Sequence, residues 1–202
     1  MFAYCENGPL RFADFNGTYR IAVIYDDTFS FHNALGFGGA CFALSIGQKY
    51  LFDDVSVYSY SNADEFKECW NKLSGHYDKI IVFGHGSGNA PAIWFQNTNS
   101  YLGLGPQSKD SITSLKYVSA EEMELHICYA AKTFPDQSPQ SIARFFSNLT
   151  GATVTATAGI HHFVPLITFT ATWADSDFPW VQVLPYSREP WKSYNPTKEA
   201  LC

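Results

Sequence analysis

Basic charge is scarce in this chain of 202 residues, and the basic residues that it has are scattered. Thirteen lysines and arginines stand against nineteen aspartates and glutamates, which gives a formal net charge of −6 at pH 7. A phosphate backbone or an anionic lipid surface is held by clustered positive charge. We therefore expect neither nucleic acid nor a membrane as a partner.

Long apolar runs are also missing. No stretch reaches the roughly 18 consecutive apolar residues of a membrane span, and the amino-terminal residues lack the basic-then-apolar order of a secretion signal. Hydrophobic residues nevertheless make up 46% of the chain and aromatic residues 17%, which excludes a disordered protein. Because no linker or break in composition divides the sequence, we expect one domain over residues 1–202, with its core at about 19–186.

The cysteines lack the pairing pattern of a disulfide framework or of zinc knuckles, because there are five of them at irregular spacings. We expect reduced thiols, as in an intracellular or other reducing compartment. Cys69 falls in an amphipathic run and is expected in a helix core, whereas Cys41 lies in a glycine-rich helical stretch. Cys5 and Cys202 stand near the chain ends, and Cys128 follows an apolar run.

From Tyr19 onward, short β-branched and aromatic runs alternate with helical stretches, which is typical of an α/β fold. We expect three layers: a mostly parallel central sheet with helices on both faces. The predicted strands are 19–27, 54–60, 78–84, 122–128 and 152–159. The predicted helices are 30–47, 63–73 (with Asn62 as its N-cap) and 139–149 (ended by Gly151). A hairpin is expected at 91–105, and two antiparallel strands at 166–173 and 180–186.

Two predicted strands end in chemically useful residues. One ends in Gly84-His85-Gly86 and a later one in His126-Ile127-Cys128. The unbroken apolar run at 80–83 and the segment 125–127 are expected to be buried and neighbouring. Because the carboxyl ends of parallel strands share one edge of the sheet, an imidazole and a thiol are expected to meet there.

An imidazole beside a thiol makes thiolate available for attack on a carbonyl carbon. We therefore predict His85 as the base and Cys128 as the nucleophile. Gly86 and Cys128 are the predicted oxyanion donors through their backbone N–H groups, and the missing side chains of Gly84 and Gly86 would let substrate approach closely.

The order of these blocks, IIVFGHGSG at 80–88 and MELHICYAA at 123–131, resembles the caspase/gingipain clan of cysteine peptidases. This clan includes clostripain, legumain, separase, the CHAT domain and the self-cleaving peptidase of large bacterial toxins. The segment SIARFFSNLTGATVTATAG at 141–159 resembles bacterial members. The resemblance covers about residues 21–159 and implies a caspase-like fold, a protein or peptide substrate, and peptide-bond cleavage through a Cys128–His85 dyad without a cofactor.

The sequence departs from true caspases, which place Gln-Ala before the cysteine and Arg-Gly or a similar pair after it. Here His126-Ile127 and Tyr129-Ala130 take those places, so the resemblance is to CHAT-like or toxin-peptidase-like members, and cleavage after aspartate is not implied. Toxin peptidases activated by inositol hexakisphosphate carry a strongly basic face, which this chain lacks.

Other interpretations of the same residues stay open. In one interpretation, the chain is a catalytically silent relative that serves as a binding or regulatory module. In another, it is an enzyme that transfers the acyl group to an amine rather than to water. His126 and Cys128 with His161-His162 suggest a zinc site, but no further ligand stands at the usual spacing and His126 is more simply a hydrogen-bonded sheet residue. Gly84–Gly88 lacks the central serine of a hydrolase elbow, and Gly36–Gly39 lacks the spacing of a nucleotide-binding loop.

The substrate pocket is expected at the same edge of the sheet. Candidate residues are Asp26 and Asp27 at the end of the first strand, the aromatic Trp94 and Phe95 of the hairpin, and the loop 159–163 with His161 and His162. An acidic pocket floor prefers a cationic side chain, because a buried carboxylate without a counter-charge is costly. We therefore expect cleavage beside a basic residue, with an apolar side chain in an aromatic pocket as the alternative.

Overall fold

A computed structural model describes residues 19–27, 53–106, 108 and 110–160, together with the backbone of strands at 161–165, 170–174 and 192–194. Its centre is a block of parallel strands in the order β2-β1-β3-β7-β8. These strands are β1 (Arg20–Asp26), β2 (Asp54–Tyr60), β3 (His76–Gly86), β7 (Ser119–Ile127) and β8 (Thr153–Ala156). The predicted α/β class is confirmed, and the sheet as a whole is mixed, with these parallel strands at its centre and antiparallel pairs beside them.

Helix α2 (Ala63–Lys72) begins at the predicted cap. Asn62 has an extended backbone, and its Oδ1 accepts a hydrogen bond from the Glu65 N–H at 3.0 Å. This bond satisfies one of the backbone donors that a helix leaves unpaired in its first turn. The apolar side of the helix, with Phe66 and Trp70, is fully buried.

Helix α3 (Ile142–Thr150) is shorter at its start than predicted. Ser141 is its N-cap, because the Ser141 Oγ accepts a hydrogen bond from the Arg144 N–H at 3.2 Å. The helix ends at Gly151, whose φ of 74° is left-handed, a backbone conformation that glycine adopts without strain. The predicted termination at Gly151 is confirmed.

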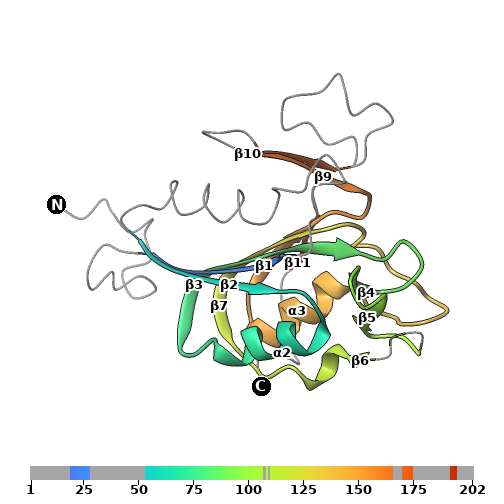
Figure 1. The fold of residues 1–202 in the computed structure, drawn as a ribbon, viewed down its shortest axis with the longest axis horizontal. Coiled ribbons are helices and arrows are strands. Elements are labelled where there is room, and N and C mark those ends of the chain that lie inside the picture. The colour runs from blue at the N-terminus through green and yellow to red at the C-terminus, as the bar shows by residue number, and fades with distance from the viewer. Residues whose placement is uncertain are drawn as a thin grey trace.

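The described helices α2 and α3 both pack against the same face of the sheet (Figure 1). Side chains from β1, β3, β7 and β8 alternate into the core on that face. On the opposite face, the buried residues Ile21, Val23, Ile81 and Phe83 form a smaller apolar cluster. The helix expected at 30–47 lies outside the described residues. No helix in the described ranges is both long and apolar enough to cross a membrane.

A hairpin adjoins the carboxyl end of β3. Strands β4 (Ala92–Phe95) and β5 (Ser100–Gly103) pair antiparallel, which confirms the predicted hairpin. Two residues of β4 also pair antiparallel with the end of β3, with His85 opposite Trp94 and Gly86 opposite Ile93. The hairpin is followed by the short strand β6 (Asp110–Ser111) and a 3₁₀ helix, η1 (Ile112–Ser114).

The carboxyl-terminal pairing differs from the prediction. Strand β10 (Thr170–Ala174) overlaps the expected 166–173 strand, but its partner is β9 (His161–Pro165), a strand that was not predicted. The expected strand at 180–186 lies outside the described residues. Strand β11 (Lys192–Tyr194) pairs antiparallel with β8. Three residues carry too little periodicity to reveal a strand, so β11 depends on its partner.

Candidate functional site

The backbone places His85 and Cys128 side by side. In the parallel register of β3 and β7, Gly84 is the partner of Ile127, so the next residue of each chain lies at the same level. Neighbouring strands lie about 4.8 Å apart. A Cβ atom added to Gly86 would overlap the carbonyl oxygen of Cys128, so the two chains stay in contact beyond the paired residues.

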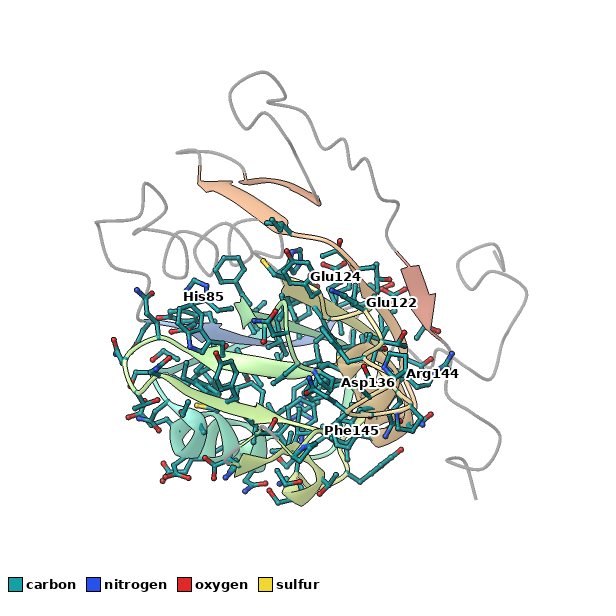
Figure 2. The ribbon with its side chains drawn as sticks, turned by 90° about the vertical axis from the view of Figure 1, so that its right-hand side faces the viewer. His85, Glu122, Glu124, Asp136, Arg144 and Phe145 are labelled. Carbon is teal, nitrogen blue, oxygen red and sulfur yellow. The ribbon has the colours of Figure 1, made fainter. Side chains whose placement is uncertain are left out.

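The two predicted catalytic residues also share a face of the sheet. Along β3, Ile81 and Phe83 point away from α2 and α3, and alternation carries His85 to the same side. Along β7, Glu124 and His126 are hydrogen-bonded to each other on that side. Cys128 directly follows the end of β7, two residues after His126, so strand alternation predicts the same side for its thiol. Figure 2 shows His85 and Glu124 on the side of the sheet away from α2.

The environment of His85 favours its neutral form. Its ring lies edge-on to the ring of Trp94, with 5.5 Å between centroids and 61° between planes. Burial lowers the pKa of His85 below its ordinary value of 6.5, because a charged imidazolium loses hydration in such surroundings. A neutral imidazole is the form that accepts a proton from a thiol.

The residue after Cys128 has an uncommon backbone conformation. Tyr129 has a φ of 58°, in the left-handed region, which costs a non-glycine residue about 1–3 kcal/mol. The turn is held by two backbone hydrogen bonds of 2.8 Å, from the Tyr129 N–H to the Gly159 carbonyl and from the Ala131 N–H to the Thr157 carbonyl. The position of Cys128 is therefore fixed by the segment that follows β8.

Lys132 connects the two loops that follow β3 and β7. Its Nζ donates a hydrogen bond to the Gly88 carbonyl at 3.3 Å and lies 5.3 Å and 4.9 Å from the ring centroids of Tyr129 and Phe134. Cations are attracted to the faces of aromatic rings. The sequence does not single out Lys132, because nothing in its local pattern shows that it meets Gly88, which is 44 residues away.

The structure gives the two glycines a role inside the fold. Gly84 lies against the hydroxyl of Tyr60, which donates a hydrogen bond to the Phe83 carbonyl at 3.0 Å, and Gly86 lies against Cys128. The sequence argument had assigned both to close approach by a substrate. Their close contacts are instead with the protein's own chain, and the oxyanion role of the Gly86 and Cys128 N–H groups stays a prediction.

The predicted pocket residues are only partly brought together. Trp94 lies beside His85, and Phe95 is fully buried in the core on the helix side. Asp26 is also fully buried; it follows the helix-side residues Ala22 and Ile24 in alternation and approaches Gly84 from that side. Its carboxylate is therefore not on the face that His85 occupies.

Asp27, in contrast, is exposed at the end of β1. Burial, Asp26 and Glu65 together raise the pKa of its carboxyl above 3.8. The side chains of His161 and His162 lie outside the described residues. The backbone of β9 begins two positions after Gly159, which accepts the hydrogen bond from Tyr129, so this strand starts close to the loop after Cys128.

A charged network that sequence reasoning missed runs beside Cys128. Glu124 Oε2 lies 3.0 Å from His126 Nε2, and Glu124 Oε1 accepts a hydrogen bond from Lys79 Nζ at 2.7 Å. Burial alone would raise the pKa of Glu124, but His126 and Lys79 outweigh it and lower this pKa to about 2. The signal in the sequence was the alternation Glu-x-His-x-Cys, which puts all three side chains on one face.

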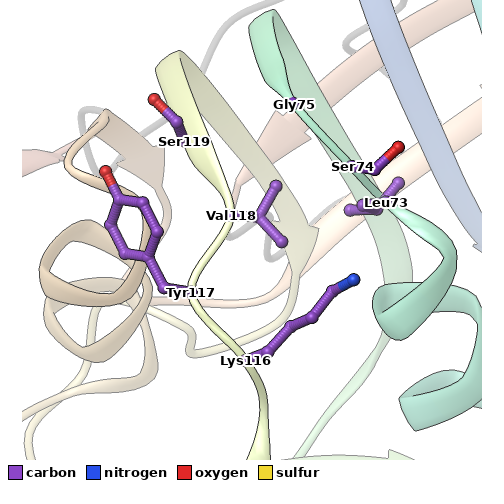
Figure 3. A pocket seen from close by; sticks show the side chains of 7 residues that line it. All are labelled: Leu73, Ser74, Gly75, Lys116, Tyr117, Val118 and Ser119. Carbon is purple, nitrogen blue, oxygen red and sulfur yellow. The ribbon is translucent and has the colours of Figure 1, made fainter.

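Metal binding has no support among the residues that the structure describes, since no three His, Cys, Asp or Glu side chains gather there as ligands would. A shallow pocket of about 270 Å³ lies elsewhere, lined by residues 73–75 and 116–119 (Figure 3). These residues precede β3 and β7, so the length of β3 puts the pocket about 30 Å from His85. It is not part of the candidate site.

No protein-family model matches the sequence. No curated protein matches it at a significant level either. The resemblance to the caspase/gingipain clan therefore depends on the residues around His85 and Cys128 and on the order of the elements that carry them.

Proposed function

We propose that the protein is a cysteine endopeptidase in which Cys128 is the nucleophile and His85 the general base, built on a three-layer fold of the caspase-like type. The observation that carries the proposal is the register of β3 and β7. It brings the two residues level with each other at the carboxyl edge of a parallel sheet, where ligands of such folds commonly bind.

The chemistry follows from the two side chains. His85, neutral because its pKa is lowered by burial, accepts the proton of the Cys128 thiol as sulfur attacks the substrate carbonyl. The proton then passes from His85 to the leaving amine, and the carbon–nitrogen bond breaks. Water adds to the resulting thioester, the acid leaves, and the thiol is restored. The carbonyl oxygen is stabilised during both steps by the N–H groups of Gly86 and Cys128.

Two further features support the proposal. The left-handed Tyr129 directly after the nucleophile stores backbone strain, and such strain collects at functional sites. Lys132 holds the loops after β3 and β7 together, and this limits the relative movement of base and nucleophile. The strain at Tyr129 costs some stability, whereas the contacts of Lys132 are favourable.

The test compares four variants with the unaltered chain: Cys128→Ala, His85→Ala and, as matched controls, Cys69→Ala and His76→Ala. Cys69 is a buried thiol of α2, and His76 lies at the opposite end of β3. Each is incubated with a diverse peptide library, and new termini are identified by mass spectrometry. We expect turnover to fall at least about 10³-fold in C128A and at least about 10²-fold in H85A, with both controls unchanged.

Labelling separates the enzyme from a silent module. An acyloxymethyl ketone or iodoacetamide at neutral pH should modify Cys128 selectively, and H85A should abolish the selectivity. Slow labelling that is insensitive to H85A would instead support a binding or regulatory module. Adding a primary amine to an active sample then distinguishes acyl transfer from hydrolysis, because only transfer gives an amide product.

A further inference from the structure

The network of Lys79, Glu124 and His126 leads along the sheet toward Cys128. Glu124 and His126 are hydrogen-bonded on one face of β7, and Cys128 comes two residues after His126, directly after the last residue of the strand. Residues two apart in a strand are separated by about 6.5 Å along its axis. The backbone of His126 is therefore one such step before that of Cys128 at the edge of the sheet.

The hydrogen bonds fix the orientation of this second imidazole. A carboxylate only accepts hydrogen bonds, so the Nε2 of His126 carries a hydrogen in the 3.0 Å contact with Glu124. Glu124 is held in turn by Lys79, whose Nζ lies 2.7 Å from the other carboxylate oxygen. Only 8% of His126 is exposed, so water screens its charge weakly. Because the pKa of Glu124 is about 2, this anchor stays charged from mildly acidic to basic pH.

We propose that His126 is the charge partner of the Cys128 thiolate and that Glu124 and Lys79 are positioning residues that hold it. This inference rests on the proposed function, since it concerns the same thiol. The two imidazoles then have separate tasks. His85 moves the proton, while His126 stabilises the negative sulfur.

The other charged groups around His126 are already engaged. On β3, Lys79 pairs with Glu124 and also with Glu122, at 3.3 Å, and His85 lies level with Cys128. Beyond β7, the Nζ of Lys132 binds the Gly88 carbonyl. The neighbouring strand β8 contributes only threonines, 153 and 155, opposite Glu122 and Glu124. Within the residues whose side chains are described, His126 is the imidazole that precedes Cys128 on β7 and is held by Glu124.

The experiment follows the reactivity of Cys128 with pH in the full-length chain. The second-order rate of carboxamidomethylation of Cys128 is measured from pH 5 to 9.5 by quantitative peptide mapping. The key variant is His126→Gln, because glutamine keeps an N–H for Glu124 but takes up no proton. Glu122→Gln is the matched control, since Glu122 lies on the same strand and, like Glu124, pairs with Lys79.

At pH 5.5 we expect H126Q to react at least about threefold more slowly than the unaltered chain. One unit of thiol pKa changes the thiolate fraction tenfold, and the higher nucleophilicity of a more basic thiolate offsets part of that loss. At pH 9.5, where the thiol is ionised in both, the rates should agree within about twofold. E122Q should follow the unaltered profile. An H126Q profile that matches the unaltered chain, or one lowered equally at every pH, would overturn the inference.

A second measurement applies even if H126Q fails to fold. The thiolate of Cys128 is followed by its absorbance near 240 nm in His85→Gln, with the corresponding Cys128→Ser double variant as the blank. Thiolate that persists at pH 6 without His85 supports His126 as the charge partner; loss of the thiolate at pH 6 overturns it. If the unaltered chain cleaves no peptide but H126Q still slows the labelling of Cys128 at pH 5.5, the proposed function is wrong and this inference holds. If the chain cleaves peptides but the labelling profile of H126Q matches that of the unaltered chain, the proposed function holds and this inference is wrong.

Discussion

The absence of a side chain at Gly86 allows the backbone of β3 to pack closely against Cys128 at the candidate site. A Cβ atom there would overlap the carbonyl oxygen of Cys128. This oxygen belongs to the backbone, so it cannot rotate away as the end of a flexible side chain could. We expect Gly86→Ala to lower the free energy of unfolding by about 2–4 kcal/mol, measured by urea denaturation. Gly88→Ala is the control: its Cβ would meet the Tyr129 ring at 3.3 Å, which a small ring shift relieves, so we expect less than about 1 kcal/mol. Equal effects in the two variants would contradict the close contact at Gly86.

His85 can be tested directly through its proton uptake. Burial lowers its pKa below 6.5, so the titration of its ring protons by NMR should have a midpoint on the acidic side of that value. The His85→Gln variant assigns the resonance. A midpoint above 6.5 would mean that a stable ion pair with the Cys128 thiolate outweighs burial, and the base would then rest in its protonated form.

Strand β7 carries a pH-dependent part of the stability through Glu124. Its folded-state pKa of about 2 lies below the ordinary 4.5, so its contribution is complete above pH 4.5 and is lost as the pH falls toward 2. The side chain is 34% exposed, and after allowing for solvent screening we expect Glu124→Gln to cost about 1–2 kcal/mol at pH 7.

The measurement is a series of urea unfolding curves between pH 7 and pH 2. The difference in free energy of unfolding between the unaltered chain and E124Q should become smaller below pH 4.5. Glu122→Gln, at a carboxylate that is 65% exposed, should cost less than about 0.5 kcal/mol at every pH. If the difference in free energy of unfolding between the unaltered chain and E124Q stayed constant from pH 7 to pH 2, the carboxylate of Glu124 would not be stabilised by its partners.

At the level of whole elements, the sequence predicted what local patterns encode. The apolar run 80–83, the cap at Asn62 and the left-handed Gly151 all mark their elements by themselves, and the structure confirms them. Pairings that join distant segments were missed, because neither β11 against β8 nor Lys79 against Glu124 leaves a local signal. The strand order predicts that His85 and Cys128 lie at the same edge of the sheet. The burial of Asp26 on the helix side depends instead on which face of β1 each residue occupies.

Across the whole molecule, the two faces of the sheet have different characters. The face toward α2 and α3 is apolar from β1 to β8. The other face is apolar over β1 and over Ile81 and Phe83 of β3. It is polar along β7, where Glu122, Glu124 and His126 follow one another and Lys79 of β3 pairs with the two glutamates. A parallel sheet with a polar strip along one central strand departs from the usual pattern of strands buried on both faces, and such departures are expected at functional sites.

This arrangement predicts opposite behaviour for the two described thiols. Cys69 is 5% exposed in the helix-side core, its Sγ lies 3.2 Å from the Ser59 carbonyl, and burial raises its pKa, so reagents should reach it only when the fold opens. Cys128, at the strand edge, is partly exposed. When iodoacetamide labelling is repeated at increasing urea concentrations, the labelling rate of Cys69 should rise exponentially with urea concentration below the unfolding midpoint. The labelling rate of Cys128 should stay within about twofold of its value without urea until the midpoint is reached. If Cys128 labelling rose in parallel with Cys69, the thiol would be part of the core rather than of an accessible site, and a catalytic role for it would be excluded.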